Sequence, residues 1–140
     1  MTTIEIKKGE ADFSFEATDM KGHMVKFDTS EETGGINFGV RPMHGVLMAL
    51  GGCSGIDIVS ILKKQRLIVE DFLMIISGER EKGKEPSLWE SVHIEFELTG
   101  SIEQEKAERA CALSINKYCS VAETLRRGGT KITWNVSVNK

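Results

Sequence analysis

Apolar residues dominate one long segment, from Pro42 to Lys64, and they do not keep to a single stripe. The segment is long enough for about six helical turns. An apolar surface all round the axis is typical of a helix that is covered on every side. The pattern therefore predicts a central buried helix with apolar residues at Val46, Leu47, Leu50, Ile56, Ile58, Val59, Ile61 and Leu62.

Gly51 and Gly52 stand in the middle of this helix, directly before Cys53. Each glycine costs about 1 kcal/mol of helix stability relative to alanine, so the pair needs a reason. Glycines here would loosen or restart the helix, or would let another backbone approach closely. We therefore expect the rest of the chain to cover this helix and to face Cys53.

Alternating apolar and polar residues predict three short strands before the helix and two longer strands after it. Polar segments that contain glycine predict loops at 29–41 and 82–87. In the last of the five strands Val92, Ile94, Phe96 and Leu98 alternate with polar residues, which indicates one buried and one polar face. The predicted strands cover residues 4–9, 12–17, 23–28, 67–81 and 88–98.

Two shorter helices and a final strand are predicted to complete the chain. Ser101 and Gln104 have the spacing of a capping box, which predicts a helix from Ser101 to about Lys117. A second capping box, Ser120 with Glu123, opens a short helix that Gly128 and Gly129 end. The final strand covers residues 131–138, with Ile132, Trp134, Val136 and Val138 on one face.

This order of elements predicts an α+β fold with mainly antiparallel sheets around the long helix, in one domain over residues 1–140. One small sheet and two short helices provide little cover for a helix that is apolar all round. An intertwined homodimer would provide the missing cover, so we expect the chain to associate with itself.

The composition is that of an ordinary soluble protein, with a net charge of −3 and a pI near 5.7. No basic stripe is present, which argues against nucleic-acid and anionic-membrane partners. The first ten residues lack the apolar core of a signal peptide, so we expect a cytoplasmic protein. In the cytoplasm a disulfide is more often catalytic or redox-sensing than structural.

The chain has three cysteines, Cys53, Cys111 and Cys119, which are too few for a disulfide scaffold and lack the spacing of a zinc site. Cys119 directly precedes the predicted helix at Ser120, where partial positive charge favours the reactive thiolate. Cys53 is surrounded by small residues that leave room for a substrate or a partner sulfur. The alternative for both is that they are small buried hydrophobic residues.

Two motifs together resemble the OsmC/Ohr family of osmotically inducible and organic-hydroperoxide-resistance proteins. The first is Arg41-Pro-Met-His-Gly-Val-Leu-Met-Ala-Leu-Gly-Gly-Cys53-Ser-Gly, and the second is Asn116-Lys-Tyr-Cys119-Ser-Val-Ala-Glu-Thr-Leu. The order of predicted elements extends the resemblance over the whole chain. The resemblance implies an OsmC-like fold, an intertwined homodimer and thiol-based reduction of organic hydroperoxides.

The resemblance also assigns roles to the two cysteines. Cys53 is the peroxidatic residue, whose thiolate attacks the O–O bond, and Cys119 is the resolving residue that forms a disulfide with it. The resemblance implies no bound cofactor and an external dithiol of the lipoyl type that would restore both thiols. The position of Cys119 at a helix N-terminus, in contrast, favours Cys119 as the more acidic thiol of the two.

The chain departs from the family pattern at the groups that hold the thiolate. Peroxidases of this family use an arginine from the N-terminal strands and a glutamate after the helix-start proline, whereas residues 1–40 contain no arginine and Met43 follows Pro42. Arg41 is the nearest substitute and is our candidate third site residue. His44 is an alternative proton donor or simply an exposed histidine.

Three further residues have structural roles as alternatives to chemical ones. Asp57 lies one turn after Cys53, where a carboxylate opposes thiolate formation unless it is paired, so we expect it to hold a buried arginine or a backbone group. We expect Cys111 to be a core residue, although it is a possible competing partner for the redox pair. His93 falls on the polar face of its strand and is expected to be solvated.

The sequence thus supports two functions of different kinds. The leading hypothesis is a peroxidase that acts on organic hydroperoxides through Cys53 and Cys119. The alternative is a dimeric scaffold with little peroxidase activity, which binds a small apolar ligand between protomers or exchanges disulfides with a partner. A peroxidase requires an unusually acidic Cys53 thiol, whereas a scaffold does not.

Overall fold

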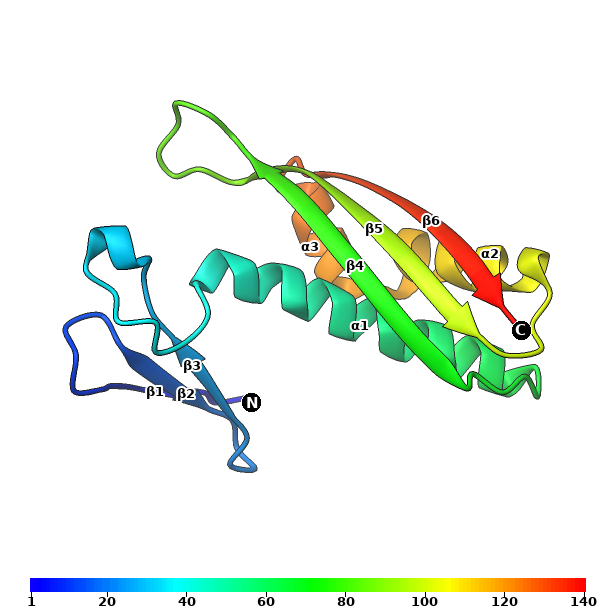
Figure 1. Cartoon of the computed structure of the whole chain (residues 1–140), viewed down its shortest axis with the longest axis horizontal. Coiled ribbons are helices and arrows are strands. Elements are labelled where there is room, and N and C mark those ends of the chain that lie inside the picture. The colour runs from blue at the N-terminus through cyan, green and yellow to red at the C-terminus, as the bar shows by residue number, and fades with distance from the viewer. The chain divides into compact units, whose positions relative to one another are not determined.

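The computed structural model describes every residue from Met1 to Lys140 and divides into two compact units, Met1–Val46 and Leu47–Lys140. Each unit contains one three-stranded sheet, and the chain forms three α-helices (Figure 1). The predicted α+β class is therefore confirmed.

The first unit is an antiparallel sheet followed by a loop. The second strand starts later than predicted, because Asp12 and Phe13 lie in the preceding turn, where Phe13 is exposed and Ser14 is buried. The Asp28 carboxylate holds the loop by accepting hydrogen bonds from the backbone N–H groups of Ile36 and Phe38. The strands are β1 (Glu5–Lys8), β2 (Phe15–Thr18) and β3 (Met24–Phe27), followed by a 3₁₀ turn η1 (Glu31–Thr33).

The long helix α1 (Pro42–Lys64) has the predicted bounds; it begins in the first unit and continues into the second. Its glycines admit side chains of strand β4 (Asp71–Arg80) rather than another backbone. A Cβ at Gly51 would lie 2.9 Å from Ile76 Cδ1, and one at Gly55 would lie 2.9 Å from Met74 Cε. Gly52 has no such neighbour. The glycines therefore bring α1 close to the sheet without interrupting the helix.

The second unit is built on the sheet β4–β5–β6, with β5 at Trp89–Thr99 and β6 at Lys131–Asn139. Strands β4 and β5 pair antiparallel, as predicted, but β5 and β6 are parallel. A parallel pair needs a long crossover, which here contains two helices. Strand β4 starts at Asp71 rather than at residue 67, because Arg66 has a positive φ of 61° and the chain turns there.

The crossover contains helices α2 (Gln104–Leu113) and α3 (Ser120–Arg127), separated by a π-helical turn η2 (Ser114–Tyr118). Both predicted capping boxes are wrong. Gln104 donates to the carbonyl oxygen of Val136, and Glu123 accepts hydrogen bonds from Arg126 and Arg127. Polar side chains at capping spacing have longer-range or later partners here. Helix α3 starts at Ser120 as predicted, whereas α2 starts at Gln104, three residues later than predicted, and gives way to the π-helical turn at Ser114.

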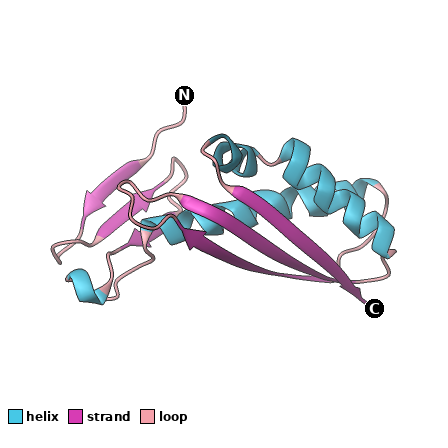
Figure 2. Cartoon of the chain, turned by 90° about the horizontal axis from the view of Figure 1, so that it is seen from above, coloured by secondary structure: helices cyan, strands magenta, loops and turns pink.

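The helices of the second unit lie on one face of the β4–β5–β6 sheet (Figure 2). The buried residues of β5 are those that the alternation predicted. Phe96 is the centre of this core, with ring centroids 6.1 Å from Phe72 and 6.4 Å from Trp134. The fully or nearly fully buried apolar residues of the second unit include Leu50, Ile58, Leu62, Val92, Ile94, Phe96, Leu98, Ile102 and Ile115.

The apolar pattern predicted that helix α1 is covered on every side, but its own chain leaves one side of it exposed. Ile56 is 73% exposed, Met48 58% and Val59 39%. By length and composition this helix could cross a membrane, but the core helix of a soluble protein meets the same criterion. Because the opposite side of α1 packs on the sheet, we interpret it as a packing helix with one unpartnered apolar stripe.

The alternation of buried and polar residues along β5 predicts that substitutions at neighbouring positions have very different effects on the free energy of unfolding. Phe96→Ala is expected to lower the free energy of unfolding by about 3–5 kcal/mol, because it removes a ring that is fully buried between two other aromatic rings. The matched control, Glu97→Ala on the opposite face, is expected to change it by about 0.5 kcal/mol or less. Urea denaturation at one protein concentration measures both, and equal effects would contradict the register.

Candidate redox site

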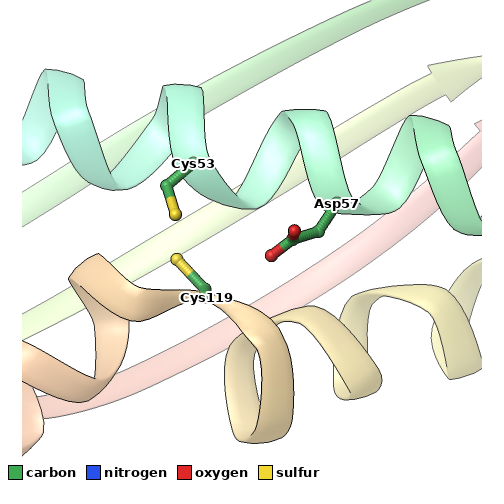
Figure 3. Close-up of side chains that lie close together, drawn as sticks. All are labelled: Cys53, Asp57 and Cys119. Carbon is green, nitrogen blue, oxygen red and sulfur yellow. The ribbon is translucent and has the colours of Figure 1, made fainter.

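Helix α1 and the start of α3 bring three reactive side chains together in the second unit. Cys53 and Asp57 extend from successive turns of α1 toward Cys119, which precedes α3 (Figure 3). The two sulfurs and a carboxylate oxygen all lie within 4.8 Å of one another. All three cysteines of the chain are reduced. The structure therefore brings together Cys53 and Cys119, the two cysteines that the family resemblance implies act as a pair.

The π-helical turn η2 fixes the position of Cys119. The Cys119 N–H donates to the Ser114 carbonyl oxygen at 2.7 Å, a bond that spans five residues and widens the last turn after α2. The Ser114 hydroxyl meanwhile contacts α1, with Ser54 O at 3.3 Å and Asp57 Oδ2 at 3.1 Å. Turns of this kind occur frequently at functional sites. Ser114 thus joins the segments that hold the two thiols.

Two opposing effects act on the Cys119 thiol. Cys119 is the N-cap of α3, and its sulfur accepts a hydrogen bond from the Ala122 N–H at 3.4 Å. Burial, however, raises the pKa of Cys119 to about 11, and the neighbouring Cys53 adds to the increase. The predicted location at a helix N-terminus is correct, but the expected acidity is wrong, because desolvation outweighs the helix amides.

Asp57 lies beside the thiols without a cationic partner. Its carboxylate accepts a hydrogen bond from Ser114, and none of the ion pairs in the structure includes it. The expectation that Asp57 holds a buried arginine is therefore wrong. No lysine, arginine or histidine hydrogen-bonds to either sulfur, so the site consists of two thiols and one carboxylate.

The other candidate residues lie outside this cluster. Arg41 and His44 are exposed residues of the first unit, and their roles remain predictions. Cys111 is a fully buried core residue, and burial raises its pKa to about 12, as expected for a structural thiol. His93 is on the polar face of β5 as predicted, where its ring nitrogens lie 2.6 Å from Thr133 Oγ1 and 2.8 Å from Glu95 Oε1.

A cavity of about 550 Å³ opens beside the cluster. It shares Asp57 with the site, and Tyr118 on its wall directly precedes Cys119. Apolar and polar side chains both face it, so it suits a small ligand with an apolar body and a polar end. The lining residues are Asp57, Ser60, Ile61, Lys64, Gln65, Leu113 and Tyr118.

Sequence reasoning missed Ser114 and the cavity. Ser114 falls inside the segment predicted as one continuous helix, where a serine is unremarkable, and no local signal shows that the helix widens there. The contact between Ser114 and Asp57 joins residues 57 positions apart, which no local pattern can show.

The chain belongs to the OsmC-like family. The profile of this family, described as OsmC-like protein, matches residues 32–135, which confirms the resemblance seen in the two cysteine motifs. A hypothetical protein from Aquifex aeolicus has a similar structure, with a TM-score of 0.82 and 28% identity, covering 100% of this chain and 98% of the other. The OsmC-like fold is therefore established.

Two further relatives define the range of the similarity. The protein YhfA of Escherichia coli K12 is 44% identical over 87 residues, which cover 61% of this chain and 64% of YhfA, less than two thirds of its length. An organic hydroperoxide resistance protein OsmC from Legionella pneumophila has a TM-score of 0.73 at 19% identity, covering 98% of this chain and 96% of the other. The second similarity shows the fold alone.

The electrostatics of the site predict a weakly acidic Cys119. Alkylation of Cys119 by iodoacetamide, followed for its own peptide by mass spectrometry, is expected to accelerate with pH up to about 11. In Cys53→Ser the midpoint should fall but stay above the ordinary value of 9.0, because burial is the largest cause of the shift. A midpoint at or below the ordinary value in the unmodified protein would mean that the helix amides dominate.

Proposed function

We propose that this protein is a thiol-dependent peroxidase that reduces organic hydroperoxides through Cys53 and Cys119. The observation that carries the proposal is the placement of two reduced thiols within 4.8 Å, one of them half-buried at Cys53 and the other buried at Cys119. This arrangement suits a reaction in which the more accessible Cys53 sulfur is oxidised by the peroxide and the buried Cys119 sulfur then reacts with the oxidised Cys53.

The reaction proceeds in three balanced steps. The Cys53 thiolate attacks the terminal oxygen of ROOH, the O–O bond breaks, and the alkoxide leaves as the alcohol after taking a proton, while Cys53 becomes a sulfenic acid. The Cys119 thiol attacks that sulfur and displaces the hydroxyl group as water, forming a disulfide. An external dithiol then reduces the disulfide by exchange and is itself oxidised.

Asp57 takes part in the proton transfers of this scheme. The high pKa of Cys119 means that this residue carries its proton at neutral pH and must lose it as it attacks. The Asp57 carboxylate lies close to both sulfurs and is oriented by Ser114, so we assign it to carry that proton to the departing hydroxyl group. Arg41 and His44 remain candidates for stabilising the Cys53 thiolate and protonating the alkoxide.

The relatives support this chemistry. Proteins from Legionella pneumophila and Elizabethkingia anophelis that share the fold are named organic hydroperoxide resistance proteins. A cytoplasmic location, where thiols stay reduced, and an external lipoyl-type dithiol would complete the catalytic cycle.

A second function is favoured by the lack of a cation beside the thiols. A peroxidase of this family would use such a cation, and without one the cavity beside Asp57 becomes the main functional feature. The protein would then be a scaffold that binds a small ligand or exchanges disulfides with a partner.

We also propose that the protein is a homodimer. The exposed apolar stripe of α1, formed by Met48, Ile56 and Val59, is the surface that a second copy would cover. Large apolar patches exposed on a single chain mark interaction sites. The stripe lies on the helix that holds Cys53, so association would also exclude water from the region of the site.

One equivalent of cumene hydroperoxide added to the reduced protein is expected to form a stoichiometric Cys53–Cys119 disulfide, mapped by mass spectrometry. Cys53→Ser should abolish oxidation, and Cys119→Ser should stop the reaction at a Cys53 sulfenic acid that dimedone traps. Cys111→Ser is the matched control and should behave as the unmodified protein. If both thiols stay reduced in the folded protein, the scaffold replaces the peroxidase.

Association through α1 predicts that Ile56→Lys yields a monomer, because a charge would be buried in the interface. Ile68→Lys is the matched control: Ile68 is 76% exposed but lies outside the stripe, so this variant should remain dimeric. Sedimentation velocity measures both. A dimeric Ile56→Lys protein would place the interface elsewhere.

A further inference from the structure

The cluster at Cys53, Asp57 and Cys119 has the donor atoms of a metal site. We propose that the reduced protein binds one Zn²⁺ ion per chain through the sulfurs of Cys53 and Cys119 and a carboxylate oxygen of Asp57. The binding uses the same thiols as the proposed peroxidase reaction but does not depend on that reaction. The three ligands come from two separate segments, which explains why cysteine spacing along the sequence predicted no metal site.

The distances are close to those that zinc requires. Zinc binds thiolate sulfur at about 2.3 Å and carboxylate oxygen at about 2.0–2.2 Å, so tetrahedral ligand atoms lie roughly 3.5–3.8 Å apart. The three donor atoms here already lie within 4.8 Å of one another. Cys53 and Cys119 point toward one another, and the Asp57 carboxylate is directed at the same gap (Figure 3). Small side-chain rotations therefore suffice to bring all three onto one ion.

The charges of the cluster also favour a cation. Two thiols and a carboxylate are close together, and no lysine, arginine or histidine is paired with them. On binding, Zn²⁺ replaces the protons of the two thiols, which leave to solvent, and no electron is transferred. The ion then balances two thiolates and the carboxylate with a net charge of −1. Soft sulfur ligands favour zinc over magnesium or calcium.

Neighbouring groups already orient two of the ligands. The Ser114 hydroxyl donates to Asp57 Oδ2 at 3.1 Å, and the Ala122 N–H donates to the Cys119 sulfur at 3.4 Å. Hydrogen bonds from outside the coordination shell orient ligands in this way in known metal sites. Three protein ligands leave one position for water or another small molecule, as in zinc sites that exchange a ligand.

Zinc binding has a consequence for the proposed reaction. The sulfur electron pairs that coordinate the ion are those that would attack a peroxide, so the zinc-bound state is protected from oxidation. Conversely, a Cys53–Cys119 disulfide removes two of the three ligands and releases the ion.

The test uses the reduced full-length protein and ZnCl₂ without any peroxide. Competition with a chromophoric chelator is expected to show one ion per chain, and Co²⁺ in its place should give the absorption bands of thiolate-to-cobalt charge transfer. Cys53→Ser and Cys119→Ser should each weaken binding by about 100-fold, and Asp57→Asn by about 10-fold or more. Cys111→Ala, a cysteine outside the cluster, should bind as the unmodified protein.

The outcomes separate the inference from the proposed function. Absence of zinc binding by the folded reduced protein would overturn the inference, as would loss of binding in Cys111→Ala or unchanged binding in Asp57→Asn. Circular dichroism establishes that each variant is folded. Disulfide formation with cumene hydroperoxide, measured without zinc, tests the peroxidase alone, so either result can fail while the other stands.

Discussion

The hydrogen bonds of the Ser114 hydroxyl are the constraint on which the site depends. They join the π-helical turn before Cys119 to two acceptors on α1: the carbonyl oxygen of Ser54, which directly follows Cys53, and the carboxylate of Asp57, one turn further on. The same turn directs the Cys119 N–H to the Ser114 carbonyl oxygen. Ser114 therefore positions both the backbone of Cys119 and the Asp57 carboxylate that lies beside its thiol.

The close approach of α1 to the sheet supports this geometry from the other side. Gly51 and Gly55 leave space for Ile76 and Met74, so the helix axis lies near β4 while Cys53 faces the crossover. Of the two residues that flank Cys53, Ser54 is buried, whereas Gly52 is exposed and a Cβ placed there would have no neighbour within 4 Å. The cost of glycine in a helix is offset by burial of apolar side chains that larger residues would displace.

Burial and charge together decide the chemistry available to the site. Desolvation raises the pKa of Cys119, and the carboxylate of Asp57 adds negative charge without an arginine to balance it. A peroxidase at this site must form its thiolate without the arginine and glutamate of the family pattern. A divalent cation is well matched to the same two sulfurs and carboxylate. The departure from the family motif and the electrostatics of the site thus describe the same feature, which is the lack of a cationic side chain beside the thiols.

The sequence by itself determined what depends on local periodicity: the bounds of α1, the buried face of β5, and the position of Cys119 at a helix N-terminus. Side-chain spacing along one element records these directly. Only the tertiary structure decided the parallel pairing of β5 with β6, the contact of Ser114 with Asp57 and the direction of the Cys119 pKa shift. Each of these arises from groups far apart in the chain, whose packing sets both distance and desolvation, and neither quantity is recorded in the neighbouring residues.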